Sequence, residues 1–251
     1  MKNQYIGDIN DYRKYGLLRI LAKTGIGSIL VVWMLTSLDR KNDGAKTNYL
    51  QNPFKYAGFD KELYEKLKKI RGNLDQNSKP PTTQSIEHGS IIPEARFFSD
   101  LVPDSKDTRM HWFSSLQKKI EHCDLIFLDP DNGIEVRSVK YGTKNSSKYV
   151  YWKELHVLWE KGKSILVYQH FPRIKRTEYM SARCRELSAI TKGSSILSFK
   201  TGNVLFLLAL QPEKRELILE IKKGVIPWEL DKLECIGYDN SGLDVVGKVG
   251  L

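Results

Sequence analysis

An aspartate and a proline directly follow one of the most apolar short segments of the chain, and this pair is the first candidate for chemistry. Residues 124–128 read Asp-Leu-Ile-Phe-Leu, and Asp129-Pro130-Asp131-Asn132-Gly133 comes next. A continuous apolar run bounded by turn formers predicts a buried strand. An acid at the carboxyl end of such a strand would present a carboxylate and nearby carbonyl oxygens to a ligand. The alternative interpretation is a plain turn, in which residues 131–133 only reverse the chain.

A second group of polar residues lies near the start of the chain, in the segment Gly7-Asp8-Ile9-Asn10-Asp11-Tyr12-Arg13-Lys14-Tyr15. The apolar spacing from Asn10 to Lys23 predicts an amphipathic helix that Asp8 or Asn10 would cap. Asp11 and Lys14 would then lie on one helix face. Without a partner elsewhere they would form a surface ion pair worth only about 0.3 kcal/mol.

A third group, Tyr168-Gln169-His170-Phe171-Pro172-Arg173, ends another apolar run, and Lys175 and Arg176 follow. His170 could bind a phosphate or a base edge, or act as an acid or base. The three basic residues suit phosphate contacts. Upstream, Lys148 and Tyr149 adjoin the polar loop 142–148, and basic residues mixed with aromatic ones suit an unstacked base and its phosphates.

The positive charge of the chain is concentrated in the same region. The 251 residues carry a formal net charge of +10, with 40 basic and 30 acidic residues. Residues 137–200 hold 14 of the basic residues and four of the acidic ones, so the rest of the chain is neutral. One basic quarter is typical of a surface that meets a polyanion, although solvated surface lysines would give the same count.

The order of predicted elements indicates an α/β fold. Buried strands at 28–35, 96–98, 124–128 and 164–169 alternate with helices at 60–71, 83–90, 108–121, 151–160 and 177–190. This alternation predicts a Rossmann-like, doubly wound, mainly parallel sheet. Strands at 196–199 and 204–210 are separated only by Thr201-Gly202-Asn203, which predicts a closing antiparallel hairpin at the sheet edge. We expect one domain, 1–251, with a flap or insertion at 73–84.

These motifs, in this order, resemble the Rossmann-like S-adenosylmethionine-dependent methyltransferases. The closest resemblance is to the bacterial enzymes that methylate adenine N6 in large ribosomal RNA, which open with Gly-Asn-x-x-Asp-x-x-Lys-His. Here Asp8 replaces the Asn and Tyr15 replaces the His. Amino-methyltransferases carry Asp/Asn-Pro-Pro-aromatic where this chain has Asp129-Pro130-Asp131-Asn132. The resemblance covers most of residues 5–210.

The resemblance implies roles for particular residues. Asp129 and the Pro130 carbonyl would accept hydrogen bonds from the amine of a flipped base, with Lys14 beside them. The aromatic that normally stacks on the base is missing and would have to come from elsewhere. The candidates for it are Tyr5, Tyr149, Tyr151, Tyr168 and Phe171. The candidates for cofactor contacts are Asp11, Tyr15, Asp43-Gly44 in place of a Gly-rich loop, Glu87 or Asp100 for the ribose, and Asp107 for the adenine amine.

The leading prediction is a cytoplasmic enzyme that uses S-adenosylmethionine to methylate an exocyclic amine, adenine N6 in particular, of RNA or DNA. One alternative is a nuclease that holds magnesium through Asp129, Asp131 and Glu135, with Lys14 nearby. Another is a methyltransferase fold that only binds nucleic acid. No HExxH, GxxxxGK[ST] or GxSxG pattern occurs, which disfavours zinc hydrolysis, P-loop hydrolysis and the serine-hydrolase elbow. No signal peptide or membrane span is expected.

Overall fold

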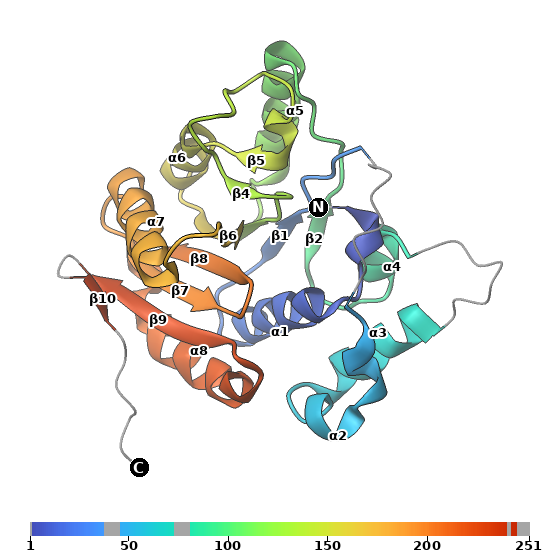
Figure 1. Cartoon of the computed structure of the whole chain (residues 1–251). Coiled ribbons are helices and arrows are strands. Elements are labelled where there is room, and N and C mark those ends of the chain that lie inside the picture. The colour runs from blue at the N-terminus through green and yellow to red at the C-terminus, as the bar shows by residue number, and fades with distance from the viewer. Residues whose placement is uncertain (1, 38–45, 73–80, 240–241, 245–251) are drawn as a thin grey trace.

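An eight-stranded sheet forms the centre of the computed structural model, which describes residues 2–37, 46–72, 81–239 and 242–244 (Figure 1). The strand order is β10-β9-β7-β8-β6-β3-β1-β2. β2, β1, β3 and β6 pair in parallel, and every pair from β6–β8 onward is antiparallel. The strands of this sheet are β1 Ile29–Val32, β2 Arg96–Phe98, β3 Leu125–Leu128, β6 Ser164–His170, β7 Ser195–Lys200, β8 Val204–Leu210, β9 Glu234–Asp239 and β10 Gly242–Asp244.

This arrangement confirms the Rossmann-like α/β sheet, with a parallel half and an antiparallel half. The hairpin through residues 201–203 forms as expected, but β8 lies inside the sheet, between β6 and β7. The expected place of the antiparallel strand at the sheet edge is therefore wrong. β9 pairs with the outer side of β7, and β10 extends the sheet further.

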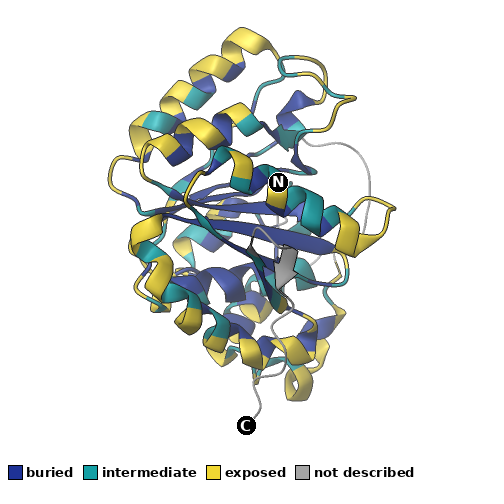
Figure 2. Cartoon of the chain, turned by 90° about the vertical axis from the view of Figure 1, so that its left-hand side faces the viewer, coloured by how far each residue is buried: buried dark blue, intermediate teal, exposed yellow. Residues whose placement is uncertain are grey.

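Helices cover both faces of the sheet (Figure 1). Figure 2 shows the strands in dark blue between helices whose outward surfaces are yellow. The helices are α1 Ile9–Lys23, α2 Pro53–Tyr56, α3 Lys61–Gly72, α4 Thr83–His88, α5 Lys106–Lys119, α6 Trp152–Glu160, α7 Arg176–Ile190 and α8 Ile218–Val225. α1, α3, α4 and α8 pack in one apolar cluster, and α5, α6 and α7 pack in another.

The strands divide their side chains between these two clusters. Ile29 and Val31 of β1 join the α1 cluster, whereas Leu30 and Val32 join the α5 cluster. Side chains alternate along a strand, so a strand covered on both faces must be apolar throughout. This is why the sequence of each central strand is a continuous apolar run.

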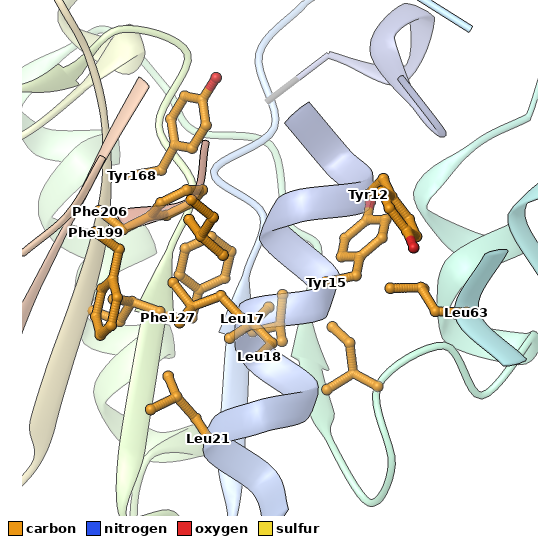
Figure 3. Close-up of a cluster of buried hydrophobic side chains, with 14 of the residues drawn as sticks. Tyr12, Tyr15, Leu17, Leu18, Leu21, Leu63, Phe127, Tyr168, Phe199 and Phe206 are labelled. Atoms are coloured by element: carbon orange, nitrogen blue, oxygen red, sulfur yellow. The ribbon is translucent and has the colours of Figure 1, made fainter. Parts of the chain in front are cut away.

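α1 packs across the middle of its face of the sheet. Figure 3 shows Leu17, Leu18 and Leu21 of α1 beside Phe127 of β3 and Phe199 of β7. All five residues are at most 2% exposed. The N-terminal end of α1 is consequently held at the carboxyl ends of the parallel strands, where ligands bind in sheets of this type.

A small parallel two-stranded sheet lies outside the main one, formed by β4 Gly133–Ile134 and β5 Tyr149–Val150. The sequence did not predict it, because two-residue strands leave no periodic pattern. The predicted flap at 73–84 falls partly outside the described residues, and its described part starts α4. Among the described residues, no helix is long and apolar enough to cross a membrane.

Candidate functional site

A buried lysine lies between two aspartates at the carboxyl end of β3. Lys14 Nζ donates to Asp11 Oδ1 at 2.7 Å and to Asp129 Oδ2 at 2.8 Å. The three side chains are 3–4% exposed. The predicted surface pair of Asp11 and Lys14 is therefore part of a buried triad, and Asp129 is its third member.

The backbone explains why Asp129 meets α1. The Asp129 N–H donates to the Val32 carbonyl at 3.0 Å, which continues the pairing of β3 with β1. Phe127 belongs to the cluster on the α1 face and Leu128 to the opposite one. Alternation then directs Asp129 to the α1 face, where Lys14 is the cation that receives it.

The segment before α1 holds the triad in place. Asp8 caps the helix by accepting from the N–H groups of Asn10 and Asp11, at 2.8 and 2.9 Å. Asp11 Oδ2 accepts from the Gly7 N–H at 2.9 Å and from the Tyr15 hydroxyl at 3.0 Å. Each residue of the predicted motif thus has a defined place: Gly7 and Tyr15 orient Asp11, and Asp11 orients Lys14.

Burial and charge act against each other within the triad. Burial lowers the pKa of Lys14, but the carboxylates of Asp11 and Asp129 outweigh it and raise that pKa above its usual value. Burial raises the pKa of Asp129, and the Lys14 ammonium offsets part of this rise. Burial and Asp11 together raise the pKa of Asp8 to about 6. Lys14 therefore stays charged and fixes the direction of the Asp129 carboxylate.

Two aromatic rings lie beside the Lys14 ammonium. Its Nζ lies 5.1 Å from the centre of the Tyr168 ring and 5.7 Å from that of Tyr15. The Tyr168 hydroxyl lies 3.3 Å from Nε2 of His170, at the end of β6. The structure therefore brings together Asp11, Lys14, Tyr15, Asp129 and Tyr168, with His170 adjoining through Tyr168.

The residues after Asp129 form a turn fixed by side chains from three segments. The Thr36 hydroxyl donates to Asp131 Oδ2 at 2.6 Å, and Lys2 Nζ lies 3.9 Å from the same oxygen. Gln169 Nε2 donates to the Asn132 carbonyl at 3.1 Å. Gly133 has a φ of +117°, and a Cβ there would lie 2.4 Å from the Gln169 amide. Only glycine fits this position, which brings the turn close to β6.

The candidates for cofactor contacts separate by position. Glu87 Oε1 accepts from the Trp33 indole at 2.9 Å and from the Ser99 hydroxyl at 2.6 Å, so it lies where β1 and β2 end. Asp100 and Asp107 are exposed, the latter in the first turn of α5. Of the two ribose candidates, Glu87 is therefore the one that hydrogen bonds hold at the ends of both strands. Asp43 and Gly44 lie outside the described residues.

An open cleft of about 720 Å³ adjoins the turn, on the α6 and α7 face of the sheet. Its lining includes the predicted Tyr149, His170 and Phe171, together with Trp152, Tyr179 and Arg183, which were not among the predicted site residues. Tyr179 and Arg183 are one helical turn apart, a spacing that marks one face of α7. This spacing, within the basic quarter, was the signal that could have identified them.

The other predicted nucleic-acid contacts lie outside the cleft lining. Lys148 is half-buried, and Arg173 is exposed. Lys175 pairs with Glu178 at 2.8 Å on the surface. The Arg176 guanidinium lies 5.4 Å from the centre of the Phe171 ring, beside the cleft. Tyr168 is buried toward Lys14 instead.

The carboxylates of the magnesium alternative have separate partners. Asp129 binds Lys14, Asp131 accepts from Thr36, and Glu135 accepts from the Trp152 N–H at 2.7 Å. Within the described ranges, no three His, Cys, Asp or Glu side chains converge as metal ligands would.

Comparison with known proteins adds no relative to this picture. No protein-family model matches the chain, and a search of curated proteins finds no similar sequence.

Proposed function

We propose that this protein is an S-adenosylmethionine-dependent methyltransferase that acts on an exocyclic amine of a nucleic-acid base, with adenine N6 as the leading target. The single observation that carries the proposal is the Lys14–Asp129 contact at the carboxyl end of the parallel strands. It joins the two motifs on which the resemblance to amino-methyltransferases rests.

The residues at the ends of β1 and β2 fit the cofactor. Glu87 Oε1 is held by Trp33 and Ser99, and among the described residues its Oε2 has no hydrogen-bond donor. A carboxylate at this place can accept from the ribose hydroxyls of a nucleoside cofactor. When bound, S-adenosylmethionine supplies an electrophilic methyl group on a positively charged sulfur.

The protein's task is then to position the amine. The Asp129 carboxylate and the Pro130 carbonyl accept hydrogen bonds from its N–H groups, which directs the nitrogen lone pair toward the methyl group. Lys14 is a positioning residue, because its ammonium holds Asp129. Once it had gained the methyl group, the amine would release a proton to water or to the Asp129 carboxylate.

Asp129 is 2% exposed, which sets a condition on catalysis. The N-terminal segment lies nearby, since Lys2 contacts Asp131 and Asn3 Oδ1 accepts from the Thr83 N–H at 3.1 Å. An amine reaches Asp129 only after a local movement of such neighbours. We therefore expect substrate binding to be coupled to a rearrangement at this end of the sheet.

The test combines calorimetry with a methyl-transfer assay. Purified protein should bind S-adenosylmethionine and transfer labelled methyl groups to bulk RNA or DNA, and Asp129→Ala should lower the transfer rate at least 100-fold. Glu216→Ala removes an exposed carboxylate from a segment far from Asp129 in the sequence. It is the control and should leave the rate unchanged. Absence of both cofactor binding and transfer would refute the proposal, and magnesium-dependent cutting of the nucleic acid would favour the nuclease instead.

A further inference from the structure

The cleft and the Lys14 triad lie on opposite faces of the main sheet. Both are at the carboxyl ends of its parallel strands. Tyr168 belongs to the apolar cluster around α1, whereas Trp152, Phe171 and Tyr179 pack against the cluster around α6 and α7. The Tyr168 hydroxyl, 3.3 Å from Nε2 of His170, connects the two sites. A ligand that passes over the carboxyl ends of the strands would therefore reach both.

Aromatic rings form the walls of the cleft. Phe171 and Tyr179 pack edge to face, with ring centres 6.1 Å apart. The Arg183 guanidinium lies 5.6 Å from the centre of the Trp152 ring and 5.4 Å from that of Tyr179. These three aromatic side chains are only partly buried, so they remain available to a flat ligand.

Arg183 itself indicates what chemistry the ligand carries. Its Nη2 pairs with Glu186, and within the part of the chain that the structure describes its buried Nε has no hydrogen-bond acceptor. Arg183 lines the cleft, and its planar guanidinium can donate to the acceptors of a flat ligand or stack on its ring. Flat rings beside a guanidinium that lines the cleft are suited to a nucleobase, which has a π face and carbonyl or ring-nitrogen acceptors.

We propose that this cleft binds an unstacked base next to the target nucleotide. The substrate would then be a single-stranded nucleic acid that passes over the carboxyl ends of the parallel strands. This inference rests on the proposed function for the position of the target base. The base in the cleft is a second one, because Asp129 and Lys14 are not part of the cleft lining. A base within a duplex has both faces covered by its neighbours, and it could not lie against Trp152 or Tyr179.

The experiment measures binding of fluorescent single-stranded oligonucleotides, RNA and DNA of one mixed sequence, without cofactor. Arg183→Gln and Arg185→Gln form a matched pair, because both remove one positive charge from α7 and Arg185 is exposed outside the cleft. We expect Arg183→Gln to weaken binding about 10-fold and Arg185→Gln less than 2-fold. Tyr179→Leu should weaken binding similarly, whereas Tyr179→Phe, which keeps the ring, should not.

Equal losses for the two arginine variants would overturn the inference, because they would show a general charge effect. Competition by a duplex of the same sequence as strong as that by the single strand would overturn it as well. Folding is checked by comparing the thermal unfolding of all four variants, and the Tyr179 pair still decides if Arg183→Gln unfolds. Binding that depends on the cleft residues, without methyl transfer, would refute only the proposed activity. Methyl transfer at an unchanged rate in these variants would refute only the proposed role of the cleft.

Discussion

Lys14 and Asp129 are 115 residues apart in the chain, and their charged groups are 2.8 Å apart in the folded protein. The ammonium also binds Asp11, so one cation is shared by two buried carboxylates. Removing the cation would therefore leave two buried carboxylates without the ammonium that they share, whereas removing Asp129 would leave a lysine that still binds Asp11.

This asymmetry predicts different costs for the two deletions. Lys14→Met should lower the free energy of unfolding at pH 7 by about 3–5 kcal/mol, and Asp129→Ala should lower it by less. The deficit of Lys14→Met should shrink at pH 5, where a carboxylate whose pKa burial raises can take up a proton. Urea unfolding at both pH values measures this, and equal costs for the two variants would contradict it.

The helix cap gives a second prediction, on pH dependence. The pKa of Asp8 is raised to about 6, so the folded state binds its proton more tightly than the unfolded state does. Its contribution to stability is full below the unfolded pKa near 4 and is lost as pH rises through 6. Asp8→Asn keeps a capping oxygen for the N–H groups of Asn10 and Asp11 but cannot ionise.

We therefore expect the stability of Asp8→Asn relative to the wild type to increase between pH 4 and pH 7, by on the order of 2 kcal/mol. Denaturant unfolding at several pH values gives this difference directly. A relative stability that stays flat across the range would show that Asp8 ionises without cost in the folded protein.

The close packing of α1 against Trp228 predicts that an alanine at position 16 is unfavourable. A Cβ on Gly16 would lie 2.2 Å from the Trp228 ring, although alanine favours helices by about 1 kcal/mol over glycine. Gly16→Ala should destabilise the protein by about 1–3 kcal/mol. Gly72→Ala, at the end of α3, meets no atom of the described residues within 4 Å and should be neutral or slightly stabilising. Thermal unfolding of both variants tests the pair.

The basic quarter predicts a salt effect at named positions. Arg173 is exposed beside the cleft, and Lys222 is a cation on α8 outside that quarter. If Arg173 contacts a phosphate, Arg173→Gln should reduce the slope of log K against log salt by about 1. Lys222→Gln should leave the slope unchanged. Oligonucleotide titrations between low and moderate salt measure both slopes, and equal slopes for all three proteins would exclude a phosphate contact at Arg173.

The fold was predictable where one pattern decides an element. β2 spans the expected residues 96–98, and β1, β3 and β6 differ from the expected strands by a few residues at most. β9 was missed because Glu234–Asp239 mixes charged and apolar residues with a glycine, and it pairs only because β7 offers an open edge. A strand that depends on its neighbour leaves little signal in its own residues.

The site was predictable in its parts and less so in its contacts. The motifs around Lys14 and Asp129 were identified, but the direct contact between them depends on how α1 lies across β3. Trp152 and Arg183 were missed because they meet only after α7 docks beside α6. Their proximity is a property of helix packing, which periodicity within each helix does not specify.

The strand order also bears on how the protein forms during synthesis. β3 pairs with β1 on one side and with β6 on the other, and β6 in turn needs β8, which ends at Leu210. Pairings between such distant segments form late, because the long intervening loop must be ordered before the contacts stabilise it. A ribosome-bound chain that stops short of β8 would hold the Lys14 and Asp129 motifs without the strand that pairs with the other side of β6. We therefore expect the triad to be acquired only after β8 has been synthesised.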